Sequence, residues 1–175
     1  MDNIINTKHW FALYIKPKHE FKSYAHIEAA GIEAFLPTVK MKKKWSDRIK
    51  TVTEPLFKGY LFIYADEKER LNALTATGVV NTVSFQGKPA AIPGWQIDNL
   101  KKMLEHPEDL IISDRIPAGT LVKVTTPPFA GLTGIVEEQS NSERYISVSI
   151  EIINRTVSVK LPSDSVVRFV EKKDL

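Results

Sequence analysis

The stretch Glu54-Pro-Leu-Phe-Lys-Gly-Tyr-Leu-Phe-Ile-Tyr64 decides the fold of the first half of the chain. Its apolar run predicts a strand, and successive side chains of a strand point to opposite faces. Tyr60, Phe62 and Tyr64 therefore share one face, whereas Leu61 and Ile63 lie on the other. A sheet face rich in aromatic rings is either a core or a surface for another macromolecule. Helices can cover only part of the sheet, and Leu61 and Ile63 suit the covered face better, so an exposed aromatic face is favoured.

The segments around this strand alternate between strands and helices. Residues 10–15 are apolar on both faces and predict a buried central strand. Residues 20–30 predict a helix that Gly31 closes, and Asp66 with Glu69 has the spacing of a capping box that starts a second helix ending near Gly78. Further expected elements are strands at 32–36, 79–85 and 89–92 and a third helix at 95–105. Together they predict an α+β fold, an N-terminal α/β sandwich with an antiparallel-rich sheet and three helices.

The second half of the chain has a different pattern. After Pro117, short strands are expected at 121–125, 133–138, 144–152, 156–161 and 166–170. This spacing predicts a small closed β-barrel. Residues 108–117 show no clear period and are interpreted as a linker. The expected organisation is an N-terminal domain at 8–107, the linker at 108–117 and a C-terminal barrel at 118–175.

Composition bounds the class of protein. The chain has 175 residues, of which 43% are hydrophobic and 26% charged, and this composition is typical of one globular domain or two small ones. It contains no cysteine, which excludes disulfides, thiolate nucleophiles and Cys-ligated metals. No apolar run reaches the roughly 18–20 residues of a membrane helix, and the first residues do not resemble a signal peptide. We therefore expect a cytoplasmic protein.

Positive charge is concentrated in one segment. Residues 1–107 carry 16 Lys and Arg against 11 Asp and Glu, whereas residues 108–175 carry 8 against 10. The segment 38–50 alone holds six basic residues and one acid, with a turn expected at Trp45–Arg48. A basic finger on a nearly neutral body indicates contact with a polyanion. The alternative is a solvated hairpin whose lysines only keep an exposed edge from pairing.

Signatures of catalysis are missing from the sequence. It has no nucleophile elbow, no phosphate-binding loop and no dinucleotide-binding glycine motif. Its four histidines show neither helical pairing nor cysteine partners, so we expect no metal site and no cofactor. The sequence thus predicts a binding protein rather than an enzyme.

Two stretches carry a family resemblance. Residues 119–136, from Gly119-Thr-Leu-Val through Pro-Pro-Phe-Ala-Gly to Thr-Gly-Ile-Val136, resemble the KOW motif, which opens an SH3-like barrel. Trp10-Phe-Ala-Leu-Tyr14, Phe35-Leu-Pro37 and residues 54–63 resemble the N-terminal (NGN) domain of NusG-type transcription elongation factors. The segment Lys44-Trp-Ser-Asp-Arg48 is most similar to that of UpxY-type paralogues, which are operon-specific antiterminators.

The resemblance implies a contact with RNA polymerase. In this family a hydrophobic concavity of the N-terminal domain receives the clamp helices of the largest subunit and helps to hold the clamp closed. A closed clamp disfavours pausing, so such a protein shifts a population and catalyses nothing. The side chains carried over to this contact are Tyr14, Phe57, Tyr60, Phe62 and Phe85.

The resemblance also implies a contact with the non-template DNA strand. The candidates near the first helix are Lys16, Lys18, His19 and Lys22, which we expect to hold phosphates. The candidates in the finger are Lys42, Lys43, Lys44, Trp45 and Arg48. Trp45 either stacks on an unpaired base or anchors the hairpin. A His-Thr-Thr loop through which some members touch the opposite side of polymerase is replaced here by Glu69-Arg70-Leu71.

The KOW-like domain is expected to recruit a second partner. In the family this partner is ribosomal protein S10 or Rho, and the matching positions are Phe129, Ile152, Ile153 and Arg155. The expected function is thus an elongation and antitermination factor, acting as a monomer and on particular operons. The alternatives are a general NusG-type factor and a KOW-bearing protein associated with RNA or the ribosome.

Overall fold

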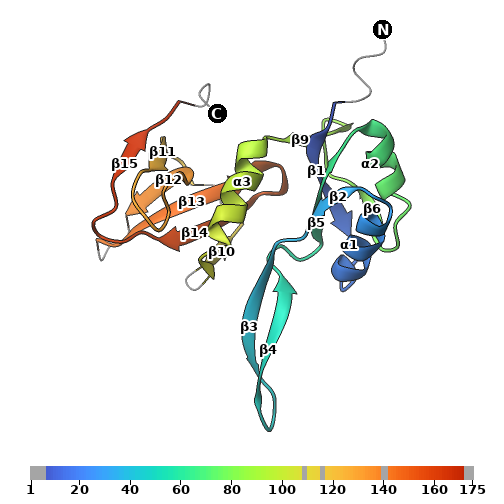
Figure 1. Cartoon of the computed structure of the whole chain (residues 1–175), viewed down its shortest axis with the longest axis horizontal. Helices are drawn as coiled ribbons and strands as arrows, with labels where there is room; N and C mark the ends of the chain where they lie inside the picture. Colours follow the sequence, from blue (N-terminus) through green and yellow to red (C-terminus); the bar gives the residue numbers. More distant parts are fainter. Residues whose placement is uncertain (1–6, 108–109, 115–116, 139–141, 172–175) are drawn as a thin grey trace. The chain divides into compact units, whose positions relative to one another are not determined.

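The computed structural model describes residues 7–107, 110–114, 117–138 and 142–171 (Figure 1). The chain divides into two compact units, Met1–Pro93 and Gly94–Leu175. The first unit contains β1 (His9–Ile15), α1 (Glu20–Ala29), β2 (Glu33–Phe35), β3 (Thr38–Lys44), β4 (Ile49–Pro55), β5 (Tyr60–Ala65), α2 (Glu67–Ala73), β6 (Val79–Thr82), β7 (Ser84–Phe85), β8 (Lys88–Pro89) and β9 (Ala91–Ile92). In the described part of the chain, no helix is long and apolar enough to cross a membrane.

The first unit is built on a sheet whose strands differ in length, with β1 in its centre. The strand order is β2-β5-β1-β6, and β9 also pairs with β1. All of these pairings are antiparallel. The prediction of a buried central strand at residues 10–15 is confirmed, since β1 is buried at all but two positions.

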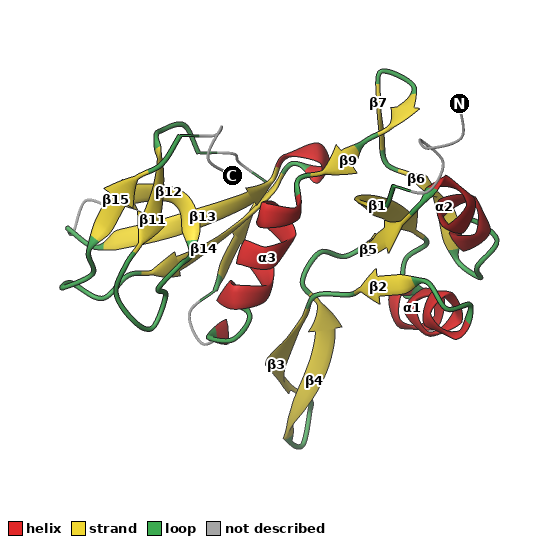
Figure 2. Ribbon diagram, turned by 45° about the horizontal axis from the view of Figure 1, so that its top comes forward, coloured by secondary structure: helices red, strands yellow, loops and turns green. Residues whose placement is uncertain are grey.

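Helices α1 and α2 cover one face of this sheet (Figure 2). The core between them contains Leu61, Ile63 and Ala65 of β5, together with residues of β1 and Ile27 of α1. Burying such aliphatic side chains stabilises the fold by about 1.5–3 kcal/mol each. The predicted alternation along β5 is therefore confirmed, with the aliphatic residues on the helix-covered face.

Helix α2 starts as the sequence predicts. The Asp66 side chain accepts a hydrogen bond from the Glu69 backbone N–H at 2.8 Å, and the Glu69 carboxylate accepts one from the Asp66 N–H at 3.0 Å. This reciprocal capping box satisfies two of the free amides at the helix start. The helix ends at Ala73, earlier than expected, and turns lead on to Gly78.

The basic segment forms a separate two-stranded hairpin, β3–β4, which leaves the sheet as the long arm seen in Figure 1. The expected turn at Trp45–Arg48 is confirmed, because the Trp45 N–H donates to the Arg48 carbonyl at 2.8 Å. The single strand expected at 54–64 is wrong, because β4 ends at Pro55 and β5 begins at Tyr60. Gly59 adopts a φ of +82° between them, a conformation that glycine tolerates and that breaks the strand.

The second unit contains α3 (Gly94–Met103), β10 (Ile111–Ser113), β11 (Leu121–Val124), β12 (Thr133–Glu138), β13 (Arg144–Ile150), a short 3₁₀ helix (Glu151–Ile153), β14 (Arg155–Lys160) and β15 (Val167–Phe169). Its strands form one antiparallel sheet in the order β10-β14-β13-β12-β11-β15. Among the described residues, β10 and β15 are the ends of this order, and no pairing closes them into a ring.

Two features of this unit differ from the expectations. Ile111–Ser113, inside the expected linker, pairs with β14 as strand β10, and its neighbours 108–109 and 115–116 lie outside the described residues. The third helix, expected in the N-terminal domain, falls in the second compact unit. There the Asn99 side chain accepts a hydrogen bond from the Thr133 N–H at 3.0 Å, and the Lys102 ammonium donates to the Gly131 carbonyl at 3.2 Å.

Candidate functional site: an aromatic face and a basic hairpin

The face of the first sheet opposite α1 and α2 carries a layer of aromatic rings. The strand register places Trp10 opposite Tyr64, Tyr14 opposite Tyr60, and Phe35 opposite Phe62. Directly opposed residues of antiparallel strands share a face, so six rings gather on this side. We call this set the aromatic face: Trp10, Tyr14, Phe35, Tyr60, Phe62 and Tyr64.

The rings of the aromatic face pack against one another. The ring centroids of Trp10 and Tyr64 are 5.4 Å apart, and those of Tyr14 and Tyr60 are 5.7 Å apart. Phe35 stacks on Phe62 with its centroid at 6.2 Å. Such pairs stabilise by about 0.5–1.5 kcal/mol beyond burial of their area. The layer is therefore pre-organised, and a partner that covers it would meet rings with little freedom left to lose.

The five aromatic residues expected to contact polymerase differ in exposure. Tyr14 is 45% exposed, Phe85 is 64% exposed, and Tyr60 is half-buried. Phe57 and Phe62 are 2% and 0% exposed, so these two side chains are not at the surface. The Phe57 ring lies edge-on against Phe62 at 6.2 Å, and Phe35 stacks on Phe62 from β2. Phe57 and Phe62 thus form a buried ring pair, whereas Tyr14, Tyr60 and Phe85 are accessible.

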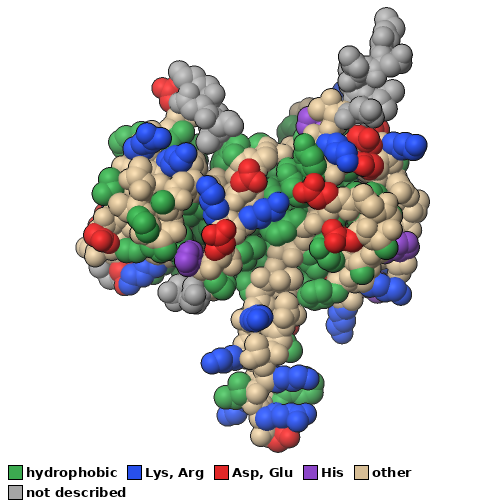
Figure 3. Space-filling view, in the orientation of Figure 1, with side chains coloured by type: hydrophobic (Ala, Val, Ile, Leu, Met, Phe, Trp, Pro, Cys, Tyr) green, Lys and Arg blue, Asp and Glu red, His purple; other side chains and the backbone are tan. Residues whose placement is uncertain are grey.

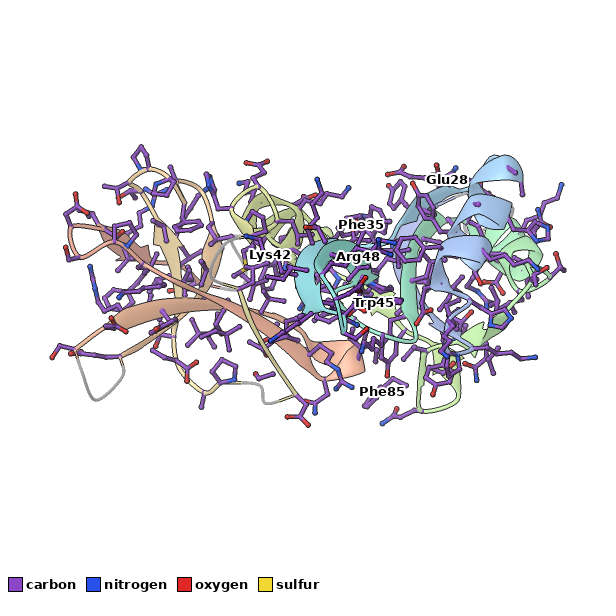
Figure 4. All side chains as sticks on the ribbon, turned by 90° about the horizontal axis from the view of Figure 1, so that it is seen from below. Glu28, Phe35, Lys42, Trp45, Arg48 and Phe85 are labelled. Carbon is purple, nitrogen blue, oxygen red and sulfur yellow. The ribbon has the colours of Figure 1, made fainter. Side chains whose placement is uncertain are left out.

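Phe85 lies apart from this cluster. It sits on the small hairpin β7–β8, whose turn holds Gln86 and Gly87 at positive φ (Figure 4). None of the ring contacts described for the first unit joins Phe85 to the aromatic face. The sequence analysis did not assign Trp10 and Phe35 to this face. The period of two in a strand could have assigned Trp10, because it is four residues from Tyr14 on the same strand and therefore shares its face.

A hollow of about 640 Å³ joins one end of the aromatic face to the base of the hairpin. Tyr14 and Phe21, each about half exposed, line it together with the basic side chains of Lys18, Lys43 and Lys58. The buried carboxylate of Glu20 accepts a hydrogen bond from the Gly59 N–H at 2.9 Å, which ties the start of α1 to the loop before β5. The structure therefore brings together three of the predicted residues, Tyr14, Lys18 and Lys43.

The basic residues before and within α1 lie close together along the chain. Lys16, Lys18 and Lys22 are exposed, and His19 is half-buried. The Nδ1 of His19 lies 3.0 Å from the Pro17 carbonyl, and Lys18 has a φ of +65° in the turn before α1. These side chains can reach an anion at the surface without any rearrangement of the sheet.

The hairpin β3–β4 carries six exposed basic side chains, the densest such group along the first unit (Figure 3). Every residue from Lys40 to Thr51 is exposed. Lys43 forms an ion pair with Glu54 across the two strands, and this hydrogen bond holds the pKa of the Glu54 carboxyl below its usual range. The ammonium of Lys50 lies 6.0 Å from the centre of the Trp45 ring. Trp45 is 56% exposed, and this cation–π contact partly fixes its position.

The residues expected to bind a partner of the second domain fall in two places. Phe129 is 8% exposed, and the His106 ring lies edge-on against it at 5.4 Å. Beside it is a hollow of about 480 Å³ lined by Pro128 and residues 159–163. Ile152, Ile153 and Arg155 lie instead at the turn between β13 and β14, where Ile153 is buried and the other two are half-buried.

The described residues offer no constellation for catalysis. Within them, no group of three or more His, Asp or Glu side chains is placed to hold a metal ion. A polar network in the first unit is made by the buried Arg70, which donates to Glu67 at 2.6 Å and to the Thr82 hydroxyl at 2.8 Å. This ion pair lowers the pKa of Glu67 and raises that of Arg70, and it joins α2 to β6.

Comparison with known proteins gives one family. The family model described as transcription termination factor NusG matches residues 8–101, which is more than half of the chain. This range contains the whole aromatic face and the basic hairpin.

Solved structures with a similar chain include NusG from Thermotoga maritima, described for its domain interaction. The two chains are 20% identical over 88% of this chain and 93% of that chain, with a TM-score of 0.45. The MjSpt4:Spt5 complex in conformation B is 17% identical over 93% of this chain and 97% of that chain, with a TM-score of 0.32. Its conformation A is 18% identical, covers 93% and 99%, and has a TM-score of 0.28.

Proposed function

The chain belongs to the NusG family of transcription factors, and from this membership we propose that it binds RNA polymerase through its aromatic face and suppresses pausing. Proteins of this family have no enzymatic activity, so the chain is not an enzyme. Its effect is a population shift: binding that is tighter to the closed clamp than to the open clamp disfavours the paused state. The size of the effect is limited by that difference in affinity.

The observation that carries the proposal is the accessibility of Tyr14 and Tyr60 next to a buried pair of rings. The Tyr14 and Tyr60 rings are 5.7 Å apart, Tyr14 is 45% exposed, and Phe62, two residues from Tyr60 on the same face, is fully buried. Tyrosine is enriched at interface hot spots because it supplies a large rigid contact and a hydroxyl group. A helix pair that lays its apolar side on this layer would bury these rings. We therefore assign the clamp-helix contact to Tyr14, Tyr60 and the half-buried Tyr64.

Phe85 extends this surface in the proposal. Its ring is 64% exposed at the tip of a tight hairpin, where a rigid turn presents it to solvent. Phe57 and Phe62 contribute indirectly, since they are buried and pack within the domain. The proposal thus keeps all five residues of the polymerase contact but divides them into contacting and supporting groups.

A second contact with polymerase is not part of the proposal. Glu69 and Arg70, which stand where some family members have His-Thr-Thr, already act within the fold. Glu69 closes the capping box and pairs with Lys8 at 2.7 Å, and Arg70 is buried between Glu67 and Thr82. Side chains committed in this way are poor ligands for another protein.

Action on particular operons is the more specific part of the proposal. The basic residues at the start of α1 and the basic hairpin give the first unit two exposed cationic segments, and DNA phosphates are their natural ligands. We propose that Lys16, Lys18, His19 and Lys22 hold the non-template strand where polymerase exposes it. The hairpin segment Lys44–Arg48 supports the likeness to UpxY-type antiterminators.

The second unit is proposed to be a KOW domain with an SH3-like barrel. Its antiparallel sheet of short strands and the Gly/Pro turn between β11 and β12 support this assignment. The domain boundary is proposed near residue 107, after α3, because the family match runs to residue 101 and includes most of that helix. Exposed parts of Ile152 and Arg155 would contact ribosomal protein S10 or Rho.

The proposed function is tested by elongation in vitro with purified RNA polymerase on a template with a strong pause site. Adding the full chain is expected to shorten the pause and to yield a polymerase complex that contains the protein. An unchanged pause together with no bound protein would show that the proposal is wrong. Deleting the gene then separates a specialised factor, which changes one operon, from a general one, which changes many.

A further inference from the structure

The two faces of the hairpin β3–β4 differ in chemistry. The register places Lys40 opposite Thr53, Lys42 opposite Thr51 and Lys44 opposite Ile49. Because opposed residues share a face and neighbours alternate, these side chains all lie on one side of the ribbon. We call this side the lysine face: Lys40, Lys42, Lys44, Thr51, Thr53 and the exposed Ile49. The other side carries Met41, Lys43, Trp45, Arg48, Lys50, Val52 and Glu54. In Figure 4, Lys42 and Trp45 are seen on opposite sides of the ribbon.

The side opposite the lysine face is engaged within the hairpin itself. Lys43 pairs with Glu54, and Lys50 lies over the Trp45 ring at 6.0 Å. Met41 and Val52 are directly opposed, and in the register they lie between Lys43 and Glu54. Two of the positive charges on this side are therefore already offset by a carboxylate or an aromatic ring.

The lysine face has no such internal partners. Its three lysines are exposed, and within the described residues no ion pair involves them. The face carries no carboxylate of its own, and two threonine hydroxyls stand beside the lysines. Lysines that served only to protect an exposed edge would have no need of a common face free of acids.

The spacing of the lysines fits a repeating anion. Alternate residues of a strand are separated by about 6.6–6.8 Å, so Lys40, Lys42 and Lys44 form a straight row about 13 Å long. Lysine and threonine side chains are among the common ligands of DNA phosphates, and such contacts position a protein without reading sequence. A row of three point charges next to hydroxyl groups is suited to one stretch of a sugar–phosphate backbone.

We propose that the lysine face binds the backbone of a DNA duplex. Proteins that hold single strands combine positive charge with rings on which bases stack, and the lysine face has no ring. Trp45 points to the other side of the ribbon, so it cannot stack on a nucleotide held by this row. A duplex presents a negative charge about every 1.7 Å along its axis, which a straight row of ammonium groups can engage without base contacts.

This inference makes the proposed DNA contact more specific. It rests on the proposed function in one respect, namely that nucleic acid binds at the hairpin. The set predicted from the sequence, Lys42, Lys43, Lys44, Trp45 and Arg48, is divided by the register. Lys42 and Lys44 belong to the duplex contact with Lys40. Lys43, Trp45 and Arg48 belong to the other side.

The test is a binding titration of the full chain, without polymerase, on a labelled 20-base-pair duplex of arbitrary sequence and on one of its single strands. One variant carries Lys40→Gln, Lys42→Gln and Lys44→Gln. The matched control carries Lys43→Gln, Arg48→Gln and Lys50→Gln. Both variants lose three positive charges from the same hairpin, and circular dichroism checks that each remains folded. Affinity is measured between 50 and 200 mM salt.

The lysine-face variant is expected to lower the slope of log affinity against log salt on the duplex by about 2.7, because each phosphate contact contributes about 0.9. The wild-type chain should then lose about 40-fold more affinity than this variant over the same fourfold rise in salt. The matched control should keep the wild-type slope.

Three results would overturn the inference. Equal slopes for the two variants would mean that only total charge matters. A loss confined to the single strand would exclude the duplex as the ligand, and an unchanged slope would exclude the lysine face. Since polymerase is absent from the assay, each of these failures would leave the pausing test of the proposed function unaffected.

Discussion

Truncating Phe62 to alanine tests whether this ring of the aromatic face is packed in the domain rather than available to a partner. The Phe62 side chain is 0% exposed, and the rings of Phe35 and Phe57 both lie 6.2 Å from it. Removing a fully buried phenylalanine ring costs about 3–5 kcal/mol of unfolding free energy. Tyr60, two residues earlier on the same strand, is half-buried, and its truncation should cost about 1 kcal/mol.

The assay is urea unfolding of the full chain. Unfolding is monitored by amide hydrogen exchange in β1 and β5, so that only the first sheet is observed. With a urea dependence of about 2 kcal/mol per molar, a loss of 4 kcal/mol lowers the midpoint by about 2 M. Tyr60→Ala should lower it by about 0.5 M. Phe62→Leu, which keeps an apolar side chain in place, is the control and should fall between the two.

The reasoning is refuted if Phe62→Ala costs no more than Tyr60→Ala. That result would mean that Phe62 is not packed against Phe35 and Phe57 and that its ring is available at the surface. The expected result has a practical consequence as well. A variant that includes Phe62→Ala cannot report on partner binding, because loss of fold would also abolish binding.

Three further outcomes are expected. Glu67→Gln should destabilise the first unit by at most about 1 kcal/mol at neutral pH, because the Glu67 side chain is more than half exposed and solvent screens its ion pair with Arg70. The folded pKa of Glu67 is lowered, so the stability that its carboxylate provides is present above its ordinary pKa and is lost as the pH falls through the lowered pKa. Wild type and variant should therefore converge in acid unfolding curves. Gly134→Ala should disrupt the second sheet and lower its thermal midpoint, since a Cβ there would lie 2.4 Å from the Ser147 carbonyl oxygen. Ile152→Ala, at a half-buried position, should weaken binding of S10 or Rho by about tenfold in calorimetry while leaving that midpoint within a few degrees.

Local signals predicted much of the fold. The alternation of aromatic and aliphatic residues after Gly59 predicted which face of β5 the helices cover, because a period of two determines the face of every side chain in a strand. The capping box at Asp66 and the turn at Trp45–Arg48 depend on residues three apart, and both are found in the structure.

Features that depend on distant residues could not be predicted in this way. The burial of Phe62 requires Phe35, which reaches it from β2, and Phe57, which precedes the strand break. The break itself follows from Gly59, whose N–H is held by Glu20 from the start of α1. Strand β10 exists because β14 pairs with it, and nothing in the local sequence around Ile111 specifies that pairing.

The charge composition of the hairpin did not show that its two faces differ in chemistry. Counting charges identified residues 38–50 as one basic finger, whereas the register sorts the same residues onto two sides with different chemistry. The division was available from alternation alone once the turn had been placed at Trp45–Arg48. A charge count therefore identifies the basic segment, whereas the alternation of side chains along each strand shows which residues share one side of the hairpin.

The account depends most on the accessible tyrosines of the aromatic face being the surface that RNA polymerase covers. The most direct measurement is the affinity of purified polymerase for the full chain carrying Tyr14→Ala and Tyr60→Ala, with Leu71→Ala, an equally exposed change on α2, as the control. If each tyrosine is a hot spot, its loss costs about 2 kcal/mol or roughly 30-fold, so the double variant should bind several hundredfold more weakly while Leu71→Ala binds as wild type. A folded double variant that binds polymerase with wild-type affinity would contradict the account.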